Sequence, residues 1–259
     1  MGDKVLIEKN NKVFIIKLNA PNKRNPLDKA LRADLKEALR KFQNDSESHV
    51  AIITGEGKAF CGGGDVEAFK NTMDPVKAVS YMSDNNDITI LITTISKPII
   101  AAVNGAAIGA GFSLAMACDI IMASTNAVFS LAFANMGLVP GMGSLYFLPR
   151  LVGMHRAKEL IYTARIIKAE EALQLGIANY VVAPEELEAR VLELATKIAD
   201  GPAVAYGLGK AILSKSFESA LPDILQFESY AQSICMQSKD HKEGVKAFYE
   251  KRAPKFEGK

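Results

Sequence analysis

The chain has 259 residues, of which 49% are hydrophobic and 23% are charged, and its formal net charge is +2. A chain of this size has enough residues for one large hydrophobic core. The near balance of charge argues against a protein that binds nucleic acid or a membrane surface, because basic residues dominate such proteins. No run of about eighteen apolar residues is present, so the sequence predicts no membrane span.

Cysteine use and the N-terminal residues indicate the cellular compartment. The first residues, MGDK, lack the apolar segment of a secretory signal peptide. The three cysteines, Cys61, Cys118 and Cys235, are odd in number and have no metal-ligand spacing, which fits a reducing environment. We therefore expect a cytoplasmic α/β protein without nucleic-acid or membrane partners.

Strands and helices alternate along the chain up to about residue 183. Short apolar runs bounded by turn residues predict strands at 13–18, 50–54, 99–103, 120–123, 128–130 and 179–182. Helical spacing and capping residues predict helices at 27–43, 74–97, 112–117, 144–151, 156–164 and 169–175. Only helices are predicted beyond residue 183. This pattern is typical of a mostly parallel sheet covered by helices, with a helical C-terminal lobe.

Particular residues predict where some of these helices begin or break. Asn25 is expected to cap the first helix, with Pro26 at its first helical position. The pair Asn85-Asn86 is expected to break the helix that starts at residue 74. A further short helix is expected to begin at about Val66.

Two glycine-rich turns share one design, which is an apolar strand, then glycines, then the start of a helix. They are residues 60–65 and residues 104–113. If the two preceding strands lie side by side, backbone N–H groups of both turns can converge on one oxygen and stabilise an enolate or a tetrahedral intermediate. The alternative interpretation is that the glycines only allow tight turns between strand and helix.

A second alternative comes from the nucleotide-binding enzymes. Gly105, Gly109 and Gly111 resemble a nucleotide-binding glycine pattern, and Tyr206-x-x-x-Lys210 resembles the catalytic pair of short-chain dehydrogenases. The position of the glycines argues against this interpretation, because a dinucleotide fingerprint belongs to the first β-α unit and about a hundred residues precede it here. The sequence also lacks a P-loop motif.

A series of segments carries a resemblance to one family over essentially the whole chain. The segments are IITG at 52–55, AFCGGGD at 59–65, KPIIAAVNG at 97–105, LAMACD at 114–119, GLVPG at 137–141, PRLVG at 149–153, AEEA at 169–172, LGIA at 175–178 and FYEKR at 248–252. Together they resemble the crotonase superfamily, which is the enoyl-CoA hydratase/isomerase family.

The resemblance implies both a fold and a ligand. The fold is α/β, a ClpP/crotonase-like spiral of ββα units over residues 1–195, followed by a helical trimerisation region over 196–259. The ligand is an acyl-CoA thioester, bound as a small-molecule substrate in fatty acid metabolism without a covalent cofactor or a metal. The assembly implied is a homotrimer or a dimer of trimers, that is, a hexamer.

The resemblance also implies positions for the site. The thioester carbonyl would lie in an oxyanion hole made by the backbone N–H groups of Gly64 and Ala110, where Ala110 replaces the more usual glycine. The positions that match the family's substrate and CoA site are Lys23, Arg24, Ala59, Cys61, Gly62, Asp65, Val66, Asn135, Phe248 and Lys251.

Some of these positions carry charged or aromatic residues, which are suited to binding coenzyme A. Lys23 and Arg24 suit its 3′-phosphate and pyrophosphate, and the alternative is a solvated surface loop. Phe248 and Lys251 match residues that reach CoA from a neighbouring subunit in the family. The alternative for these two is ordinary helix amphipathicity.

The chain departs from the family at the positions of the catalytic acids. Hydratases of the family place two glutamates around the substrate double bond, and this sequence has Ser113 and Phe133 there. Some isomerases use an aspartate at the position of Gly141. Because loss of one acid–base group typically costs ~10²–10⁴-fold in rate, we expect very slow hydration of crotonyl-CoA.

Two interpretations of the function therefore stay open. In the first, the chain is a lyase or an isomerase whose acid or base lies elsewhere, and the candidate groups are Asp65, Glu67, Ser113, Asn135, Ser144 and Tyr146. In the second, the chain is a non-catalytic subunit that binds acyl-CoA as a partner or regulator. Each candidate group also has an ordinary structural role, such as a helix cap for Asp65.

Overall fold

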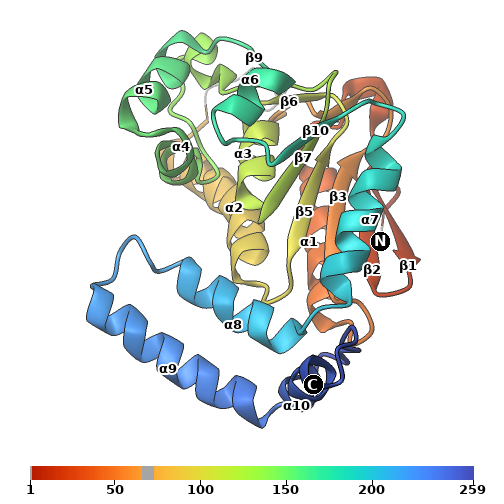
Figure 1. Ribbon diagram of the computed structural model, residues 1–259. Coiled ribbons are helices and arrows are strands. Elements are labelled where there is room, and N and C mark those ends of the chain that lie inside the picture. The colour runs from red at the N-terminus through yellow and green to blue at the C-terminus, as the bar shows by residue number, and fades with distance from the viewer. Residues whose placement is uncertain (1, 66–72) are drawn as a thin grey trace.

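The computed structural model describes residues 2–65 and 73–259, and its strands form two sheets (Figure 1). The larger sheet has the order β1-β2-β3-β5-β7-β10, with strands β1 (Val5–Asn10), β2 (Val13–Leu18), β3 (Val50–Gly55), β5 (Ile99–Val103), β7 (Ile120–Ser124) and β10 (Tyr180–Val182). The smaller sheet has the order β4-β6-β8-β9, with strands β4 (Ala59–Cys61), β6 (Ala106–Ile108), β8 (Val128–Ser130) and β9 (Ile167–Lys168). The β1–β2 and β8–β9 pairs are antiparallel, and the other pairs are parallel.

Successive ββα units place one strand in each sheet. Strands β3 and β4 precede helix α2 (Pro75–Thr94), and β5 and β6 precede α3 (Ala110–Ala117). Strands β7 and β8 precede the short 3-10 helix η3 (Ala132–Met136) and helix α4 (Ser144–Val152). Because the first strands of the units pair with one another and the second strands do the same, the units stack like turns of a spiral. The crotonase fold expected from the resemblance is confirmed.

The larger sheet is buried on both faces, which explains the continuous apolar runs of its strands. On one face Ile53 belongs to the same core cluster as Leu35 of helix α1 (Lys29–Asn44). On the other face Ile52 belongs to a second cluster with Val191 of helix α7 (Leu187–Ala199). Figure 1 shows α7 and α1 on opposite sides of the strands.

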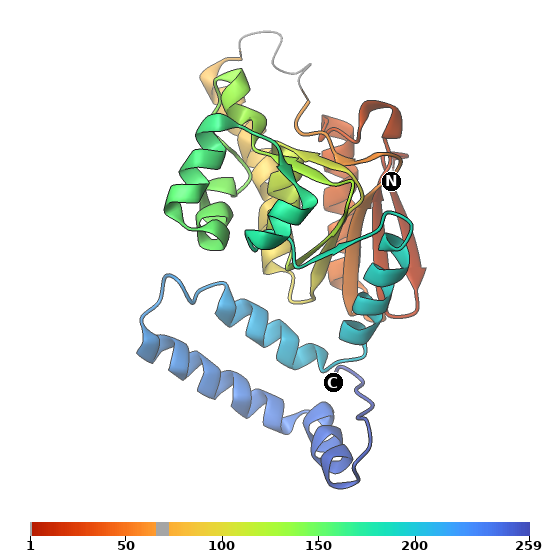
Figure 2. The same ribbon diagram turned by 45° about the horizontal axis from the view of Figure 1, so that its top comes forward.

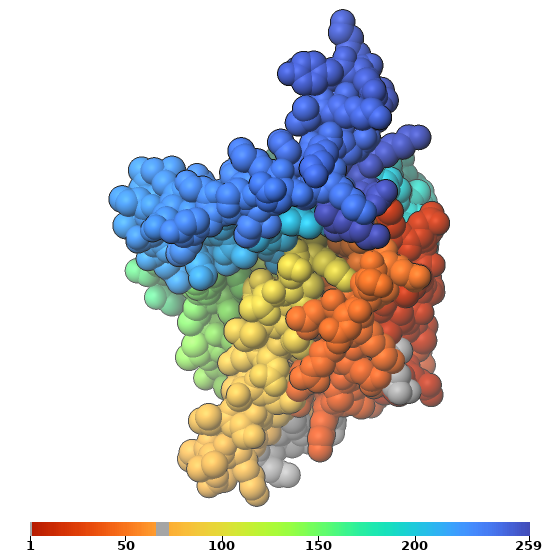
Figure 3. Space-filling model, turned by 90° about the horizontal axis from the view of Figure 1, so that it is seen from below, coloured from red at the N-terminus to blue at the C-terminus, as the bar shows by residue number. Residues whose placement is uncertain are grey.

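The C-terminal helices form an arm that lies along one end of the core (Figures 1 and 2). They are α8 (Ala203–Leu213), α9 (Leu221–Gln237) and α10 (Lys239–Tyr249), and α8 lies nearest the core. Seen from below, the arm crosses the end of the core and α10 projects beyond it (Figure 3). The predicted division at residue 195 falls inside α7, which covers the sheet, so the two-part organisation stays a prediction.

The two helix predictions based on asparagine are wrong. Helix α1 begins at Lys29 and is capped by Asp28, whose carboxylate accepts the Leu31 N–H at 2.8 Å. Asn25 instead lies before the helix with a left-handed φ of 52° and is fully buried. Helix α2 is continuous through Asn85, because the Asn85 side chain donates to the Tyr81 carbonyl of the preceding turn at 2.8 Å.

Other expectations from the sequence differ from the structure or fall on residues that it does not describe. Residues 106–108, expected to be part of a turn, form strand β6. The short helix expected from Val66 lies outside the described residues. Two further helices complete the path between α4 and β10, and they are α5 (Met154–Thr163) and α6 (Ala169–Gln174). None of the described helices combines the length and apolar character that a bilayer crossing requires.

Candidate active site

The two glycine-rich turns are neighbours in space. Strands β4 and β6, which lead into them, pair in parallel with Ala59 opposite Ala106. The side chain of Asn104 joins the preceding loops, because its amide donates to the carbonyl oxygens of Gly55 and Gly57 at 2.9 Å each. The condition under which backbone N–H groups of both turns can converge on one oxygen is therefore met.

Glycine is required where the turns meet. A Cβ atom on Gly111 would lie 2.2 Å from the Cys61 carbonyl oxygen, and one on Gly105 would lie 2.1 Å from the Lys58 carbonyl oxygen. Gly109 has a φ of 53°, a conformation that side-chain-bearing residues rarely adopt. The glycines thus allow tight turns, as the alternative interpretation held, and the same turns bring the backbone of both strands together.

Ala110 is the first residue of helix α3. The helical hydrogen-bond ladder begins with the bond from the Ser113 N–H to the Gly109 carbonyl, at 3.1 Å, so the Ala110 N–H precedes it. The Gly109 N–H donates to the Ser130 carbonyl at 2.7 Å, which fixes this helix start to the end of β8. A helix N-terminus with its first amides outside the ladder attracts an oxygen that carries negative charge.

Gly64 is attached to the segment that precedes α1. The Leu27 N–H donates to the Gly63 carbonyl at 2.8 Å, and Leu27 and Gly64 form a parallel bridge. The Gly62 N–H donates to the Arg24 carbonyl at 2.7 Å. These bonds connect the turn to the loop that carries the predicted CoA cations.

Asn25 holds the same loop against β4. Its side-chain oxygen accepts the Ala20 N–H at 2.7 Å, and its amide donates to the carbonyls of Glu56 and Ala59 at 3.0 and 2.9 Å. Because the side chain is fully buried, these bonds form in a medium that excludes water. The sequence predicts Asn25 as a helix cap, so this anchoring role was missed.

A pocket of about 640 Å³ opens beside the Gly64 turn. Its wall is formed by Lys23, Arg24, Pro26, Asp28, Gly62, Gly64, Asp65, Ala106 and Ile108. The two cations are exposed, as a group that meets a phosphate in solution must be. The structure thus places five of the predicted site residues around one pocket, namely Lys23, Arg24, Gly62, Gly64 and Asp65.

Two other predicted CoA-site residues, Ala59 and Cys61, have buried side chains beneath this pocket. Burial raises the pKa of the Cys61 thiol to about 12, so it is a neutral core side chain. Both residues support the site through their backbone in β4.

The acid positions 113 and 141 are joined by a pair of buried hydroxyl groups. The Oγ atoms of Ser113 and Ser144 lie 2.6 Å apart, and both side chains are fully buried. The Ser113 Oγ lies 3.1 Å from the Gly109 carbonyl oxygen, and the Ser144 Oγ lies 2.8 Å from that of Gly141. The two hydroxyls are therefore satisfied by each other and by backbone carbonyls.

Apolar side chains lie at or beside positions 133 and 141, where the resemblance implies acids. The ring of Phe133 in η3 approaches to 3.9 Å from the place of a Cβ on Gly109. The terminal methyl of Met82 in α2 lies 3.0 Å from the place of a Cβ on Gly141. An aromatic ring and a methionine methyl group thus occupy the space beside Gly109 and Gly141.

Further candidate residues lie away from the two turns. Asn135 is exposed on η3. The Tyr146 hydroxyl donates to the Ser214 carbonyl at 3.3 Å, next to the arm, and burial raises the pKa of this phenol. Phe248 is 79% exposed on α10, and Lys251 is exposed just after it. Val66 and Glu67 lie outside the described residues.

Lys210 does not form a dehydrogenase-like pair with Tyr206. Its Nζ donates to the Asp119 carboxylate at 2.7 Å and to the Ile92 carbonyl at 2.9 Å, and it lies 3.3 Å from the Lys97 carbonyl oxygen. Burial raises the pKa of Asp119, and the ammonium group beside it opposes that shift. These contacts join α8 to the core, so Lys210 has a structural role.

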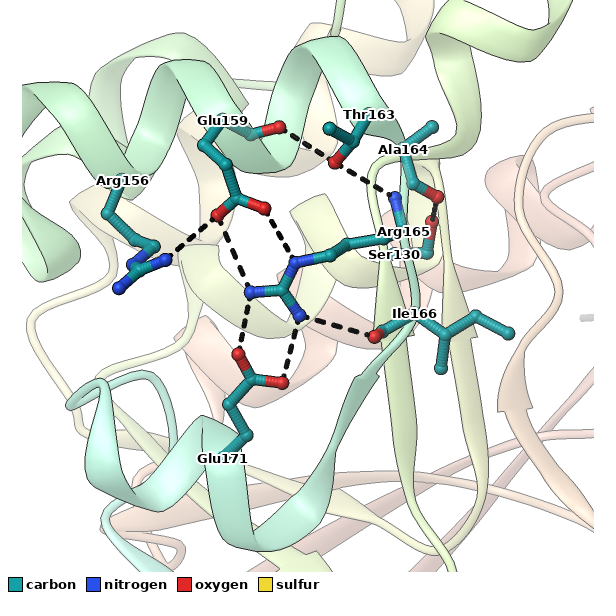
Figure 4. A network of polar contacts seen from close by, with 8 residues as sticks. All are labelled: Ser130, Arg156, Glu159, Thr163, Ala164, Arg165, Ile166 and Glu171. Carbon is teal, nitrogen blue, oxygen red and sulfur yellow. Dashed lines mark hydrogen bonds and ion pairs between the residues drawn. The ribbon is translucent and has the colours of Figure 1, made fainter.

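A charged cluster centred on Arg165 lies next to Ser130 at the end of β8 (Figure 4). The Arg165 guanidinium donates from Nε to Glu159 at 2.7 Å and from its two terminal nitrogens to Glu171 at 2.9 and 2.6 Å. Hydrogen bonds from Arg165 lower the pKa of both carboxyl groups. The preceding residue, Ala164, accepts the Ser130 hydroxyl at 2.7 Å, so the cluster fixes the end of β8.

Comparison with known proteins gives one family over nearly the whole chain. Residues 8–259 match the family model described as enoyl-CoA hydratase/isomerase. The chain is 36% identical over 255 residues to a crotonyl-CoA hydratase of Syntrophomonas wolfei, covering 98% of both chains. It is 38% identical over 255 residues to a short-chain-enoyl-CoA hydratase of Clostridium acetobutylicum, covering 98% of this chain and 97% of the relative.

Solved structures agree with the sequence comparison. The crystal structure of an enoyl-CoA hydratase subunit I from Geobacillus kaustophilus superposes with a TM-score of 0.94 at 36% identity, covering 99% of this chain and 98% of that one. The dehydrogenase interpretation is therefore wrong. The chain belongs to the enoyl-CoA hydratase/isomerase family of the crotonase superfamily.

Proposed function

We propose that this protein binds an acyl-CoA thioester with its carbonyl oxygen between the backbone N–H groups of Gly64 and Ala110, and that it stabilises the thioester enolate. The parallel pairing of β4 with β6 carries this proposal, because it brings the two turns together. Two fixed N–H donors aimed at a developing oxyanion are each worth several kcal/mol. Membership of a family whose named relatives act on CoA thioesters supports the same ligand.

We further propose that the protein is not a conventional hydratase. Water addition needs one group to activate water and another to deliver a proton. Ser113 is buried against Ser144, and Phe133 is apolar, so neither supplies a carboxylate. The reaction that suits this site is one in which bond cleavage itself generates the enolate, as in loss of a carboxyl group. Asp65, which lines the pocket beside Gly64, is then the candidate for moving a proton.

The same proposal assigns residues to the parts of coenzyme A beyond the thioester. Lys23 and Arg24 at the pocket would bind its phosphates by charge-assisted hydrogen bonds. Phe248 and Lys251 would reach the CoA of a neighbouring subunit in a trimer or a dimer of trimers. Helix α9 supports such an assembly, because none of its residues is buried and Leu221 is 69% exposed. We place the protein in the cytoplasm, where its three free thiols stay reduced.

A panel of thioesters tests the proposal. Crotonyl, 3-enoyl, malonyl-type and aromatic CoA thioesters are added to the purified protein, binding is read by calorimetry and turnover by mass spectrometry. We expect binding of several thioesters, conversion of a class with a good leaving group, and a crotonyl-CoA hydration rate below about a thousandth of a normal hydratase. A hydration rate within tenfold of a normal hydratase would contradict the proposal. Tight binding without any conversion would instead favour the non-catalytic subunit.

The geometry of the Ser113–Ser144 pair also indicates which substitutions could restore hydration. A glutamate at position 113 needs the space of the Ser144 hydroxyl, which lies only 2.6 Å from the Ser113 Oγ. We therefore expect Ser113→Glu with Phe133→Glu to stay slow, and the addition of Ser144→Gly to raise crotonyl-CoA hydration. The matched control is Ser144→Gly alone, which should not hydrate.

A further inference from the structure

Arg32 is a charged side chain on the buried side of helix α1, with only 4% of its surface exposed. Its Nη1 donates to the Leu27 carbonyl at 2.8 Å, and its Nε donates to the Asp84 carboxylate of α2 at 2.9 Å. The guanidinium carbon also lies 4.6 Å from the centre of the Tyr81 ring. Because a buried guanidinium is costly without partners, these contacts fix its position between two helices and a loop.

The loop residue that Arg32 binds is itself bonded to the Gly64 turn. Leu27 donates its N–H to the Gly63 carbonyl at 2.8 Å and pairs with Gly64 in a parallel bridge. Leu27 is fully buried, so it has no free space in which to shift without its neighbours. A displacement of Leu27 therefore displaces the backbone that carries the Gly64 N–H.

We propose that Arg32 is a positioning residue for the Gly64 N–H. Arg32 is bound to α2 through Asp84. It therefore holds Leu27, and the Gly64 turn that is bonded to Leu27, at a fixed distance from α2. An oxyanion donor works only within about 2.7–3.1 Å of the oxygen, so a small shift of the turn weakens it. This inference rests on the proposed oxyanion hole, and it adds a residue that touches neither substrate nor cofactor.

Helix α2 takes part in this arrangement. Hydrogen bonding from Lys36 of α1, and then from Arg32, lowers the pKa of Asp84, so its carboxylate is charged at neutral pH. The Asp84 carboxylate therefore binds two cations of α1, and one of them, Arg32, also reaches Leu27 in the loop before α1. Loss of Asp84 should act on the Gly64 turn in the same direction as loss of Arg32, with a smaller effect.

The test measures how strongly the bound thioester carbonyl is polarised. The probe is crotonyl-CoA with ¹³C at the carbonyl, whose stretching frequency is read by infrared difference spectroscopy in the full-length protein. We expect the wild-type protein to lower this frequency. In Arg32→Met part of the shift should be lost, and residual hydration should fall between about tenfold and a hundredfold. Binding of the probe should change less than about threefold, because the N–H donor interacts more strongly with the oxyanion of the transition state than with the carbonyl of the bound probe.

Controls separate this inference from the proposed function. Arg40→Met makes the same substitution at an exposed position of α1 and should leave the stretching frequency unchanged. If wild-type protein shifts the carbonyl and folded Arg32→Met shifts it equally, Arg32 has no positioning role. If wild-type protein gives no shift, the oxyanion hole itself is refuted. If Arg32→Met does not fold, Asp84→Asn replaces it, and an unchanged frequency in that variant overturns the inference.

Discussion

The two glycine-rich turns of the site are held in place by different means. The Gly64 turn is held by side chains from elsewhere in the sequence, because Asn25 binds the β4 backbone and Arg32 binds Leu27 beside it. The Ala110 turn is held by the backbone of α3 and β8 and by close contact at Gly111. Buried polar side chains thus reinforce the backbone bonds of one half of the proposed oxyanion hole, whereas the other half depends most on the absence of a side chain at Gly111.

This difference predicts two kinds of mutational response. On the Gly64 side, each polar group contributes a limited amount, so substitutions should give graded losses. On the Ala110 side, an added carbon atom collides with backbone, which cannot move independently, so the loss should be abrupt.

Removal of each N–H donor compares the two halves directly and should have the largest effect. Ala110→Pro suits this test because proline is tolerated at the first position of a helix, where the lost N–H has no partner within the helix. We expect Ala110→Pro and Gly64→Pro each to lower turnover of the substrate found in the thioester panel by about 10²–10³-fold.

The controls for this pair keep the backbone N–H. Ala110→Gly and Gly64→Ala should retain most of the turnover, measured by mass spectrometry under the same conditions. Unchanged turnover in either proline variant would show that its N–H does not contact the reacting carbonyl.

Gly111→Ala tests the close contact on the Ala110 side. The added Cβ would lie 2.2 Å from the Cys61 carbonyl oxygen, so β4 and α3 must separate. We expect the free energy of unfolding, measured in urea, to fall by about 3 kcal/mol. Gly209→Ala is the matched control, because nothing lies within 4 Å of its added atom. It should be neutral or slightly stabilising in the interior of α8.

Asn25→Ala tests the polar anchoring on the Gly64 side. The substitution removes bonds to the Ala20 N–H and to the carbonyls of Glu56 and Ala59 in a buried place. We expect a loss of about 2 kcal/mol in the free energy of unfolding. Asn126→Ala, at an exposed position of the turn after β7, is the control and should change stability little. Equal stability of the Asn25 and Asn126 variants would contradict the anchoring role.

The pH dependence of the Asp84 contact should give the smallest effect. Its folded pKa lies below the ordinary 3.8, so its ionised form stabilises the fold above that pH, and this contribution is lost as the pH falls through the lowered value. We expect the wild-type protein to be more stable than Asp84→Asn by at most about 1 kcal/mol at pH 6. The difference should vanish on acidification below the lowered pKa. A difference that does not depend on pH would show that charge is not its cause.

The main elements of the fold could be predicted from the sequence because their signals are local. The apolar run 99–103 is a buried strand, and the glycines after it flank the short strand β6 that precedes α3. The sequence showed that both turns carry the same strand-glycine-helix design, and the structure added that the strands of the two turns pair. The motifs shared with the family indicated the order of the ββα units along the chain.

The polar anchors could not be predicted, because their partners are distant in sequence. Asn25 next to Pro26 resembles a helix cap, and only its contact with β4, 34 residues away, explains its buried side chain. Arg32 follows Leu31 in a helix whose apolar residues recur at helical spacing, and nothing in that pattern marks an arginine as buried, because charged residues usually face solvent. Its burial depends on Asp84, 52 residues later.

The buried Ser113–Ser144 pair also restricts how such a chain can change over evolutionary time. A carboxylate at position 113 alone would be crowded against Ser144 in a place without water, whereas a glycine at position 144 alone would leave the Ser113 hydroxyl without this partner. Each single step is disadvantageous, and only the two together give a functional acid. A chain with this pair should therefore exchange both serines together, because either single substitution is expected to lower its stability.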